Sequence, residues 1–302
     1  MKPKNAFLLF TAAFIWGIAF VAQSSAAAFI RPFTFNGIRC LIGGITLLPL
    51  VYIMQVKKAK SLPSGKSFDK KRLISADELK TGILGGICCG ICLCLGSTLQ
   101  QFGIELTTVG KAGFITALYI VFVPIVSALF LRKKIGLPVI ISVILGLVGL
   151  FLLCMTEQFS IGKGDFYVLL CSFAFTAHIL VIDYFSAKAD GVFLSCVQFL
   201  TCGIISLPFI LFMEKPQISQ IIAAGLPILY AGVLSCGVAY TLQIVGQKNM
   251  NPTIASLILS LESVVSVLAG WIILRQTLSG REIVGCIIMF FAIMIAQLPS
   301  RS

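Results

Sequence analysis

The hydrophobic positions of the chain form ten long runs, each near the roughly 20 residues that a helix needs to cross a hydrocarbon core of about 30 Å. None of the runs alternates apolar and polar residues as the strands of a membrane barrel do. The pattern therefore predicts an all-α integral membrane protein with ten transmembrane helices. The expected spans are 5–23, 35–55, 80–101, 109–131, 137–155, 165–185, 192–213, 221–246, 252–274 and 282–298.

The second half of the sequence repeats the first. With an offset of 143, the tripeptide at 98–100 matches the tripeptide at 241–243, both reading Thr-Leu-Gln. Earlier in the chain the offset becomes 159, and Gly44 then matches Gly203. The change of offset falls in the long loop between the second and third spans, so five spans correspond to five spans.

Five is an odd number, so the second repeat is expected to enter the membrane in the opposite sense to the first. The predicted domains are a first five-helix repeat at 1–155 and a second, inverted five-helix repeat at 156–302. Inverted repeats of this kind are a recurring plan of secondary transporters, in which the substrate site lies near the bilayer midplane between the repeats.

The basic residues are distributed unevenly between the loops. With the N-terminus inside the cell, the cytoplasmic segments hold 16 of the 23 Lys and Arg residues, and the loop at 56–79 is the most basic. Short basic loops mark the cytoplasmic side. The net charge of +12 therefore indicates topology and a lipid bilayer with anionic headgroups as partner, and not nucleic acid. We expect a multi-pass protein of the cytoplasmic (inner) membrane with both termini cytoplasmic.

The composition of the chain argues against a soluble domain, a metal or cofactor site, and ATP hydrolysis. Hydrophobic residues make up 58% of the chain and charged residues 11%, against about 45–50% and about 25% in soluble domains. The eleven cysteines lie in or beside apolar runs, where Cys behaves as a small hydrophobe. The chain has one histidine and lacks a phosphate-binding Gly-x-x-x-x-Gly-Lys-Ser/Thr loop. We expect no metal, no cofactor and no ATP hydrolysis.

Polar and amphipathic groups deep in the spans are the candidate substrate-binding residues, because an unpaired charge there costs at least about 2.5–3.5 kcal/mol. Glu262 lies near the middle of the ninth span, and its partner under the offset of 143 is Tyr119 in the fourth. Trp16 and His178 lie near the middle of the first and sixth spans. These four residues are predicted to line one cavity; the alternatives are core packing for Trp16 and hydrogen bonds between helices for Glu262 and His178.

Three further polar residues are interpreted by their depth. Gln100 and Gln243 are repeat equivalents near opposite membrane faces, which suits a pair of gates, although hydrogen bonding at a helix end explains them equally well. Arg39 lies a little inside the second span and is expected to extend its guanidinium toward the membrane surface, which favours a role in positioning over one in binding.

Several motifs resemble those of the EamA-type permeases of the drug/metabolite transporter superfamily. They are the pair Trp16-Gly17, the run at 107–119 continuing to Val123-Pro124, and the ninth-span run at 261–265. The resemblance covers nearly the whole chain and implies ten helices around a central cavity, with export or exchange of small metabolites. The chain departs from the family pattern at Ser263, where a proline often follows the glutamate, and at Gln276, where a glutamate often stands; proton coupling is therefore left open.

The sequence thus predicts a secondary transporter of small organic metabolites such as amino acids, an exporter or exchanger working by alternating access, and not an enzyme. One alternative is an intramembrane enzyme that uses Glu262, His178 and Asp183. The other is a non-transporting membrane sensor. The expected partner is a small-molecule substrate, and the sequence leaves a homodimer open.

Overall fold

The computed structural model describes residues 3–60, 76–107, 109–132, 135–154, 162–273 and 279–296, and all the regular structure in these segments is helical. The first half contains α1 to α6. Their bounds are α1 Pro3–Ala27, α2 Pro32–Lys60, α3 Ala76–Ile104, α4 Val109–Thr116, α5 Tyr119–Leu131 and α6 Leu137–Cys154.

The second half contains eight α-helices and two π-helical segments, η1 and η2. Their bounds are α7 Lys163–Ser186, α8 Gly191–Phe209, η1 Ile210–Glu214, α9 Ile218–Ala223, α10 Gly225–Leu229, η2 Tyr230–Tyr240, α11 Thr241–Gln247, α12 Pro252–Leu259, α13 Leu261–Ile273 and α14 Gly280–Ala296. Some of these segments continue one another, so that α8 with η1, α10 with η2 and α11, and α12 with α13 each form one long apolar stretch.

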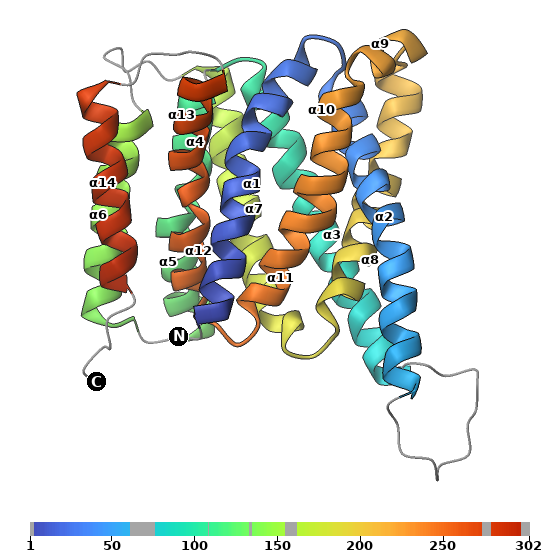
Figure 1. Cartoon of the computed structure of the whole chain (residues 1–302), viewed down its shortest axis with the longest axis horizontal. Helices are drawn as coiled ribbons and strands as arrows, with labels where there is room; N and C mark the ends of the chain where they lie inside the picture. Colours follow the sequence, from blue (N-terminus) through green and yellow to red (C-terminus); the bar gives the residue numbers. More distant parts are fainter. Residues whose placement is uncertain are drawn as a thin grey trace.

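Eight helical stretches of the described chain are long and apolar enough to cross a membrane. A shorter apolar helix covers Leu137–Leu152 within α6, and α14 has 17 residues. These two lie side by side at one edge of the molecule (Figure 1). A helix suits such segments because it pairs the backbone hydrogen-bonding groups internally, where lipid offers no partner. The expected all-α membrane fold is confirmed, with eight helical stretches long enough to cross a membrane, whereas the count of ten transmembrane helices stays a prediction.

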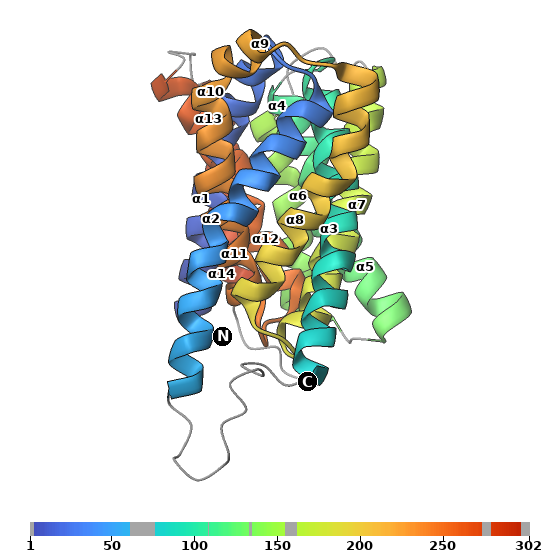
Figure 2. The same cartoon turned by 90° about the vertical axis from the view of Figure 1, so that its right-hand side faces the viewer.

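Glycine contacts between the two halves follow the offset of 159 found in the sequence. A Cβ atom added at Gly44 would meet the side chain and backbone nitrogen of Leu200, and one added at Gly203 would meet the same atoms of Leu41. Leu200 and Gly203 are the repeat equivalents of Leu41 and Gly44. The contact between α2 and α8 is therefore reciprocal, because the glycine of each helix packs against the equivalent leucine of the other, as in a two-fold contact. Figure 2 shows these helices beside each other.

A second reciprocal contact relates the ends of the molecule. The amide of Asn5, in α1, donates a hydrogen bond to the backbone oxygen of Gly246 at the end of α11. A Cβ atom at Gly164, the repeat equivalent of Asn5, would meet the backbone oxygen of Gly103 at the end of α3. The first helix of each repeat thus starts beside the end of the other repeat's third helix. In Figure 1, α1 starts at the lower end and α7 at the upper end, so the two helices run in opposite senses.

Two helices break at equivalent positions. The helix α4 ends at Thr116 and α5 begins at Tyr119, while α12 ends at Leu259 and α13 begins at Leu261. With the offset of 143, the break between α4 and α5 falls on Ser260. Each break lies in the middle of an apolar stretch, and the residue that follows the first break is the predicted cavity residue Tyr119. In both halves, a helix is therefore interrupted at the level of the candidate site.

Glu214 joins the ends of two helices that are far apart in sequence. Its carboxylate accepts hydrogen bonds from the backbone nitrogens of Phe33 and Thr34, in the first turn of α2, at 2.9 and 2.6 Å, and from the Thr34 hydroxyl at 2.6 Å. A carboxylate at this place satisfies free N–H groups and interacts favourably with the helix dipole.

We expect Glu214→Gln to destabilise the protein by about 1–2 kcal/mol, because the amide nitrogen cannot accept a hydrogen bond. The measurement is the melting temperature in detergent, which should fall by several degrees. Glu282→Gln is the matched control: Glu282 caps its own exposed helix start through Ser279, so its loss should cost less. Equal shifts in the two variants would show that the link between α2 and η1 adds nothing.

Candidate functional site

A cavity lies in the interior, between helices of both repeats. Its volume is about 480 Å³, including the part open to its surroundings. The lining residues are Trp16, Phe20, Gln23, Arg39, Gln100, Tyr119, Phe175, His178, Ile179, Ser235, Tyr240, Gln243, Leu259 and Glu262.

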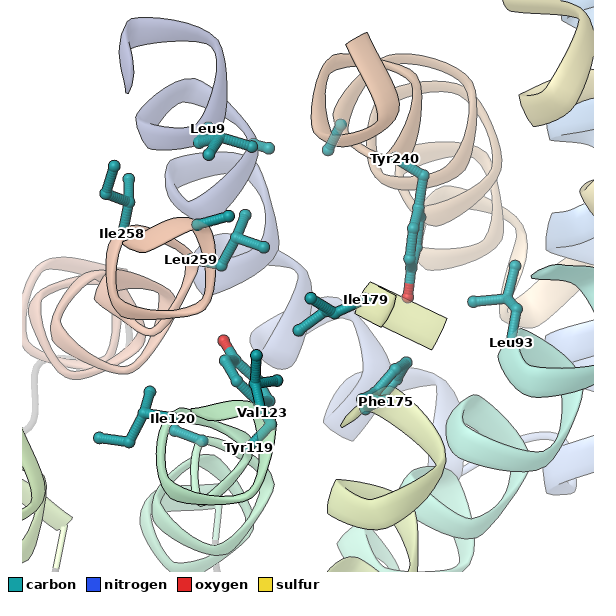
Figure 3. Packing of buried hydrophobic residues seen from close by; sticks show 14 of the residues in the cluster. Leu9, Leu93, Tyr119, Ile120, Val123, Phe175, Ile179, Tyr240, Ile258 and Leu259 are labelled. Carbon is teal, nitrogen blue, oxygen red and sulfur yellow. The ribbon is translucent and has the colours of Figure 1, made fainter. Parts of the chain in front are cut away.

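The structure brings all six predicted site residues to this one cavity. The four substrate-binding candidates come from α1, α5, α7 and α13, and the two gating candidates from α3 and α11. Figure 3 shows Tyr119 of α5, Phe175 and Ile179 of α7, and Tyr240 of η2 around the same interior region. The four residues predicted to share a cavity lie together, and the two glutamines, which were expected near opposite membrane faces, line the same cavity. The roles of all six in binding and gating stay predictions.

The hydroxyl of Tyr119 donates a hydrogen bond to Oε1 of Glu262 at 3.0 Å. Both residues are buried, and Glu262 is only 7% exposed. The two are repeat equivalents, 143 positions apart. Under a two-fold rotation, a residue can touch its own equivalent only close to the axis. The Tyr119–Glu262 pair therefore marks the junction of the repeats.

Aromatic rings form one wall of the cavity. The ring centroids of Trp16 and Tyr240 lie 4.5 Å apart with planes tilted by 58°, and those of His178 and Tyr240 lie 5.9 Å apart, edge to face. The indole nitrogen of Trp16 is buried and has no hydrogen-bond acceptor among the described residues. A buried donor of this kind costs free energy unless something pairs with it, so the cavity offers a solute an unused N–H group.

His178 is tied to a neighbouring helix. Its Nε2 lies 3.0 Å from Oε1 of Gln198 in α8, and the donor depends on the tautomer. The alternative of a hydrogen bond between helices is therefore realised, although the ring also lines the cavity. Asp183, the third member of the enzyme alternative, is not among the lining residues. Of the three residues of this alternative, Glu262 and His178 line the cavity.

The two gating candidates differ in their hydrogen bonds. The amide of Gln100 donates to the hydroxyl of Thr116, the last residue of α4, at 3.2 Å. The side-chain oxygen of Gln243 is buried without a donor among the described residues. The two equivalent glutamines thus differ in their hydrogen bonds, and Gln243 presents an unused buried acceptor.

The expectation for Arg39 is wrong. Arg39 is 3% exposed and lines the cavity, so its guanidinium does not extend to the membrane surface. The physical reason is its position on the face of α2 that meets α8 and η2, where neighbouring helices cover it. A single sequence gives the depth of a residue in a span but not the neighbours of its face.

Sequence reasoning also missed several other lining residues. Two could have been found with the offset of 159, because Phe175 is the repeat equivalent of Trp16, and Ile179 is the equivalent of Phe20. Ser235 and Tyr240 belong to the π-helical segment η2, which the hydrophobic pattern does not indicate. A π-helix shifts the faces of the residues that follow, and such segments are frequent at functional sites.

Metal-binding geometry is not seen in the part of the chain that the structure describes. No three His, Cys, Asp or Glu side chains come together there as metal ligands would. Ten of the eleven cysteines are described, and none of these forms a disulfide.

Comparison with known proteins adds a family match and two curated relatives. A model of the EamA-like transporter family matches residues 4–155 and 162–297. An uncharacterized transporter of Archaeoglobus fulgidus is 30% identical over 287 residues, which are 95% of this chain and 83% of the relative. The uncharacterized transporter YoaV of Bacillus subtilis is 21% identical over 280 residues, or 91% of this chain and 90% of the relative.

A solved crystal structure also resembles this chain. It covers 100% of the chain and 99% of its own, with a TM-score of 0.78 and 17% identity. At this identity the likeness concerns the fold alone. The same helical arrangement therefore exists in an experimentally determined protein.

Proposed function

The chain belongs to the EamA-like transporter family, and from this premise we propose that it is a secondary carrier that moves small organic metabolites, such as amino acids, through its central cavity by alternating access. The resemblance noted in the sequence is thereby confirmed, and the relatives are named as transporters. Transport is more consistent with these findings than an enzymatic role.

One observation carries the proposal. The buried Tyr119–Glu262 pair lies in the cavity lining at the junction of the two repeats. In carriers built from inverted repeats, this junction is where the substrate and the coupling ion bind. We take the ten spans as two inverted five-helix repeats, with α6 and α14 as the fifth span of each, because the contacts between the halves are reciprocal and α1 and α7 run in opposite senses.

The test is efflux from proteoliposomes. The purified protein is reconstituted, the vesicles are loaded with a defined mixture of amino acids and other small metabolites, and the solutes that leave are identified by mass spectrometry. Efflux of a subset that depends on the protein supports the carrier. If no solute leaves faster than from protein-free vesicles, in either direction of a proton gradient, the carrier is refuted and a sensor takes its place.

The proposed topology places both termini, and the loop between α2 and α3, on the cytoplasmic side of the inner membrane. The first turn of α1 and the ends of α2 and α14 lie at one end of the molecule, while α9 lies at the other end (Figure 2). The charge distribution identifies the first of these ends as cytoplasmic. The loop itself and the termini lie outside the described residues.

We expect a membrane-impermeant thiol reagent applied to intact cells to modify Ser219→Cys and to spare Asn249→Cys. Both residues are exposed, Ser219 in α9 and Asn249 after α11, and both variants are made in a chain without native cysteines. Permeabilised cells are the control, since both positions should then react. Modification of Asn249→Cys alone in intact cells would invert the orientation.

A further inference from the structure

Arg39 is a buried cation on the cavity wall, and no anionic partner for it lies among the described residues. We propose that its guanidinium binds an anionic oxygen group, a carboxylate or a phosphate, of the transported solute. The inference rests on the proposed carrier function and deepens it, because it assigns to the cavity a class of substrate and a residue that recognises it.

Arg39 is 3% exposed, and no ion pair forms between it and any acidic residue in the described part of the chain. Glu262 lines the same cavity, but its carboxylate accepts its hydrogen bond from Tyr119 and not from Arg39. A positive charge inside a membrane protein is expensive, and such charges pair with one another or mark the path of a substrate or ion. We therefore expect the anion that pairs with Arg39 to bind in the cavity that Arg39 lines.

The Nε atom of Arg39 donates a hydrogen bond to Oδ1 of Asn36, one turn earlier in α2, at 3.1 Å. Asn36 is itself held by Ser97 and Thr98 of α3, at 2.8 and 3.0 Å. The guanidinium also lies 5.2 Å from the centre of the Phe35 ring. Asn36 and Phe35 therefore fix the Nε side of the group.

The Nε atom of Arg39 is held, whereas its two terminal nitrogens have no hydrogen-bond acceptor among the described residues. These nitrogens carry four of the five N–H donors of a guanidinium, in a planar arrangement that matches two oxygens of a carboxylate or phosphate. An arginine held at Nε and free at its terminal nitrogens is ready to bind such a group with little further loss of freedom.

The equivalent of Arg39 under the offset of 159 is Gln198. The side-chain oxygen of Gln198 is engaged with His178, whereas its buried amide nitrogen has no hydrogen-bond partner among the described residues. The second repeat thus fills this position with a neutral amide. The first repeat fills it with a charge that has no anionic partner among the described residues. Helix packing alone does not require a charge here, since the equivalent place is packed without one.

Binding can be followed through Trp16. The chain has two tryptophans, and Trp271 is half-exposed on the outside, so Trp271→Phe leaves the cavity residue Trp16 as the fluorescent reporter. The probes are propanoate, methyl phosphate and propanamide; propanoate and propanamide have nearly the same shape and differ in charge. We expect at least one of the two anions to change Trp16 fluorescence at concentrations about tenfold or more below those needed for propanamide, as a charge-assisted bidentate contact allows.

Two substitutions in this background test the assignment to Arg39. Arg39→Gln removes the charge, and Asn36→Asp places a carboxylate where it pairs with Nε. Both should abolish the preference for the anion while the response to propanamide remains, which also shows that the cavity is intact. Arg31→Gln, at an exposed arginine just before α2, is the matched control and should keep the preference.

Equal responses to propanoate, methyl phosphate and propanamide in the protein with Arg39 would overturn the proposal, as would an anion preference that survives Arg39→Gln. A preference for propanoate alone assigns a carboxylate, and one for methyl phosphate a phosphate. If the anion preference is found but no solute crosses the membrane, the carrier function fails and the anion site stands. If metabolites cross but the preference is absent, the carrier stands and the anion site fails.

Discussion

Replacing Glu262 with glutamine should abolish transport driven by a pH gradient and leave the exchange of solute for solute largely intact. The substitution keeps the size of the side chain and an oxygen that can accept the hydrogen bond of Tyr119, and it removes the group that can carry a proton. Coupled transport requires that a proton binds and leaves in each cycle, whereas exchange moves no net proton. The measurement is flux into proteoliposomes with and without a proton gradient, and with solute on both sides.

The Tyr119→Phe variant is the partner experiment. It removes only the hydroxyl that donates to Glu262 and keeps the ring in the cavity wall. We expect coupled transport to continue with an altered dependence on pH, because the carboxyl group remains but loses its hydrogen bond. Loss of both activities in folded Glu262→Gln protein would indicate direct contact with the solute. Full activity of this variant in both assays would contradict a central role and leave Glu262 as a buried tie between helices.

Removing the hydrogen bonds at one end of the molecule should open the cavity to that side, and removing those at the other end should open it to the opposite side. At one end, Asn5 donates hydrogen bonds to the backbone oxygens of Gly246 and Lys248, at 2.9 and 3.1 Å. At the other end, the hydroxyl of Thr107 donates to Asp165 at 2.5 Å. A hydrogen bond contributes about 1 kcal/mol net, and each 1.4 kcal/mol changes a population tenfold. Asn5→Ala and Thr107→Val should therefore shift accessibility several-fold in opposite directions.

The measurement is alkylation of Ser235→Cys in a chain without native cysteines, because Ser235 is a buried residue of the cavity lining. An impermeant reagent added on the Asn5 side should react faster in Asn5→Ala, and one added on the opposite side should react faster in Thr107→Val. Thr11→Val is the control, since the Thr11 hydroxyl donates only to Phe7 within its own helix. Rates that rise from the same side in both variants would contradict opposed gates.

The sequence alone leads to the Tyr119–Glu262 pair for a physical reason. A duplicated chain keeps equivalent residues at a constant separation, and the offset of 143 connects these two residues through the sequence itself. Polar groups at that depth in lipid need partners. Equivalent residues near the midplane of two packed repeats are therefore expected to contact each other. The same offset relates the break after Thr116 to that at Ser260, although the hydrophobic pattern does not indicate the breaks themselves.

Other features depend on information that a linear pattern does not contain. The face of α2 that carries Arg39 is covered because α8 and η2 pack there, and the order of helices around the cavity is not written in the hydrophobic periodicity. The π-helix η2 changes which residues face inward, and Tyr240 enters the cavity wall through it. The hydrogen bond from Thr107 to Asp165 joins segments 58 positions apart, which no local motif indicates.

Because Tyr119 and Glu262 lie at the junction of the repeats, the pair depends on both repeats being parts of one chain. In a dimer of two identical, oppositely oriented halves, each residue at this place would meet a copy of itself. Two glutamates at hydrogen-bond distance would repel one another when ionised, and two tyrosines would provide no carboxyl group. One chain containing both repeats permits a donor on one side and an acceptor on the other. A dimer of identical halves would not permit the single carboxyl group that this chain places between its repeats.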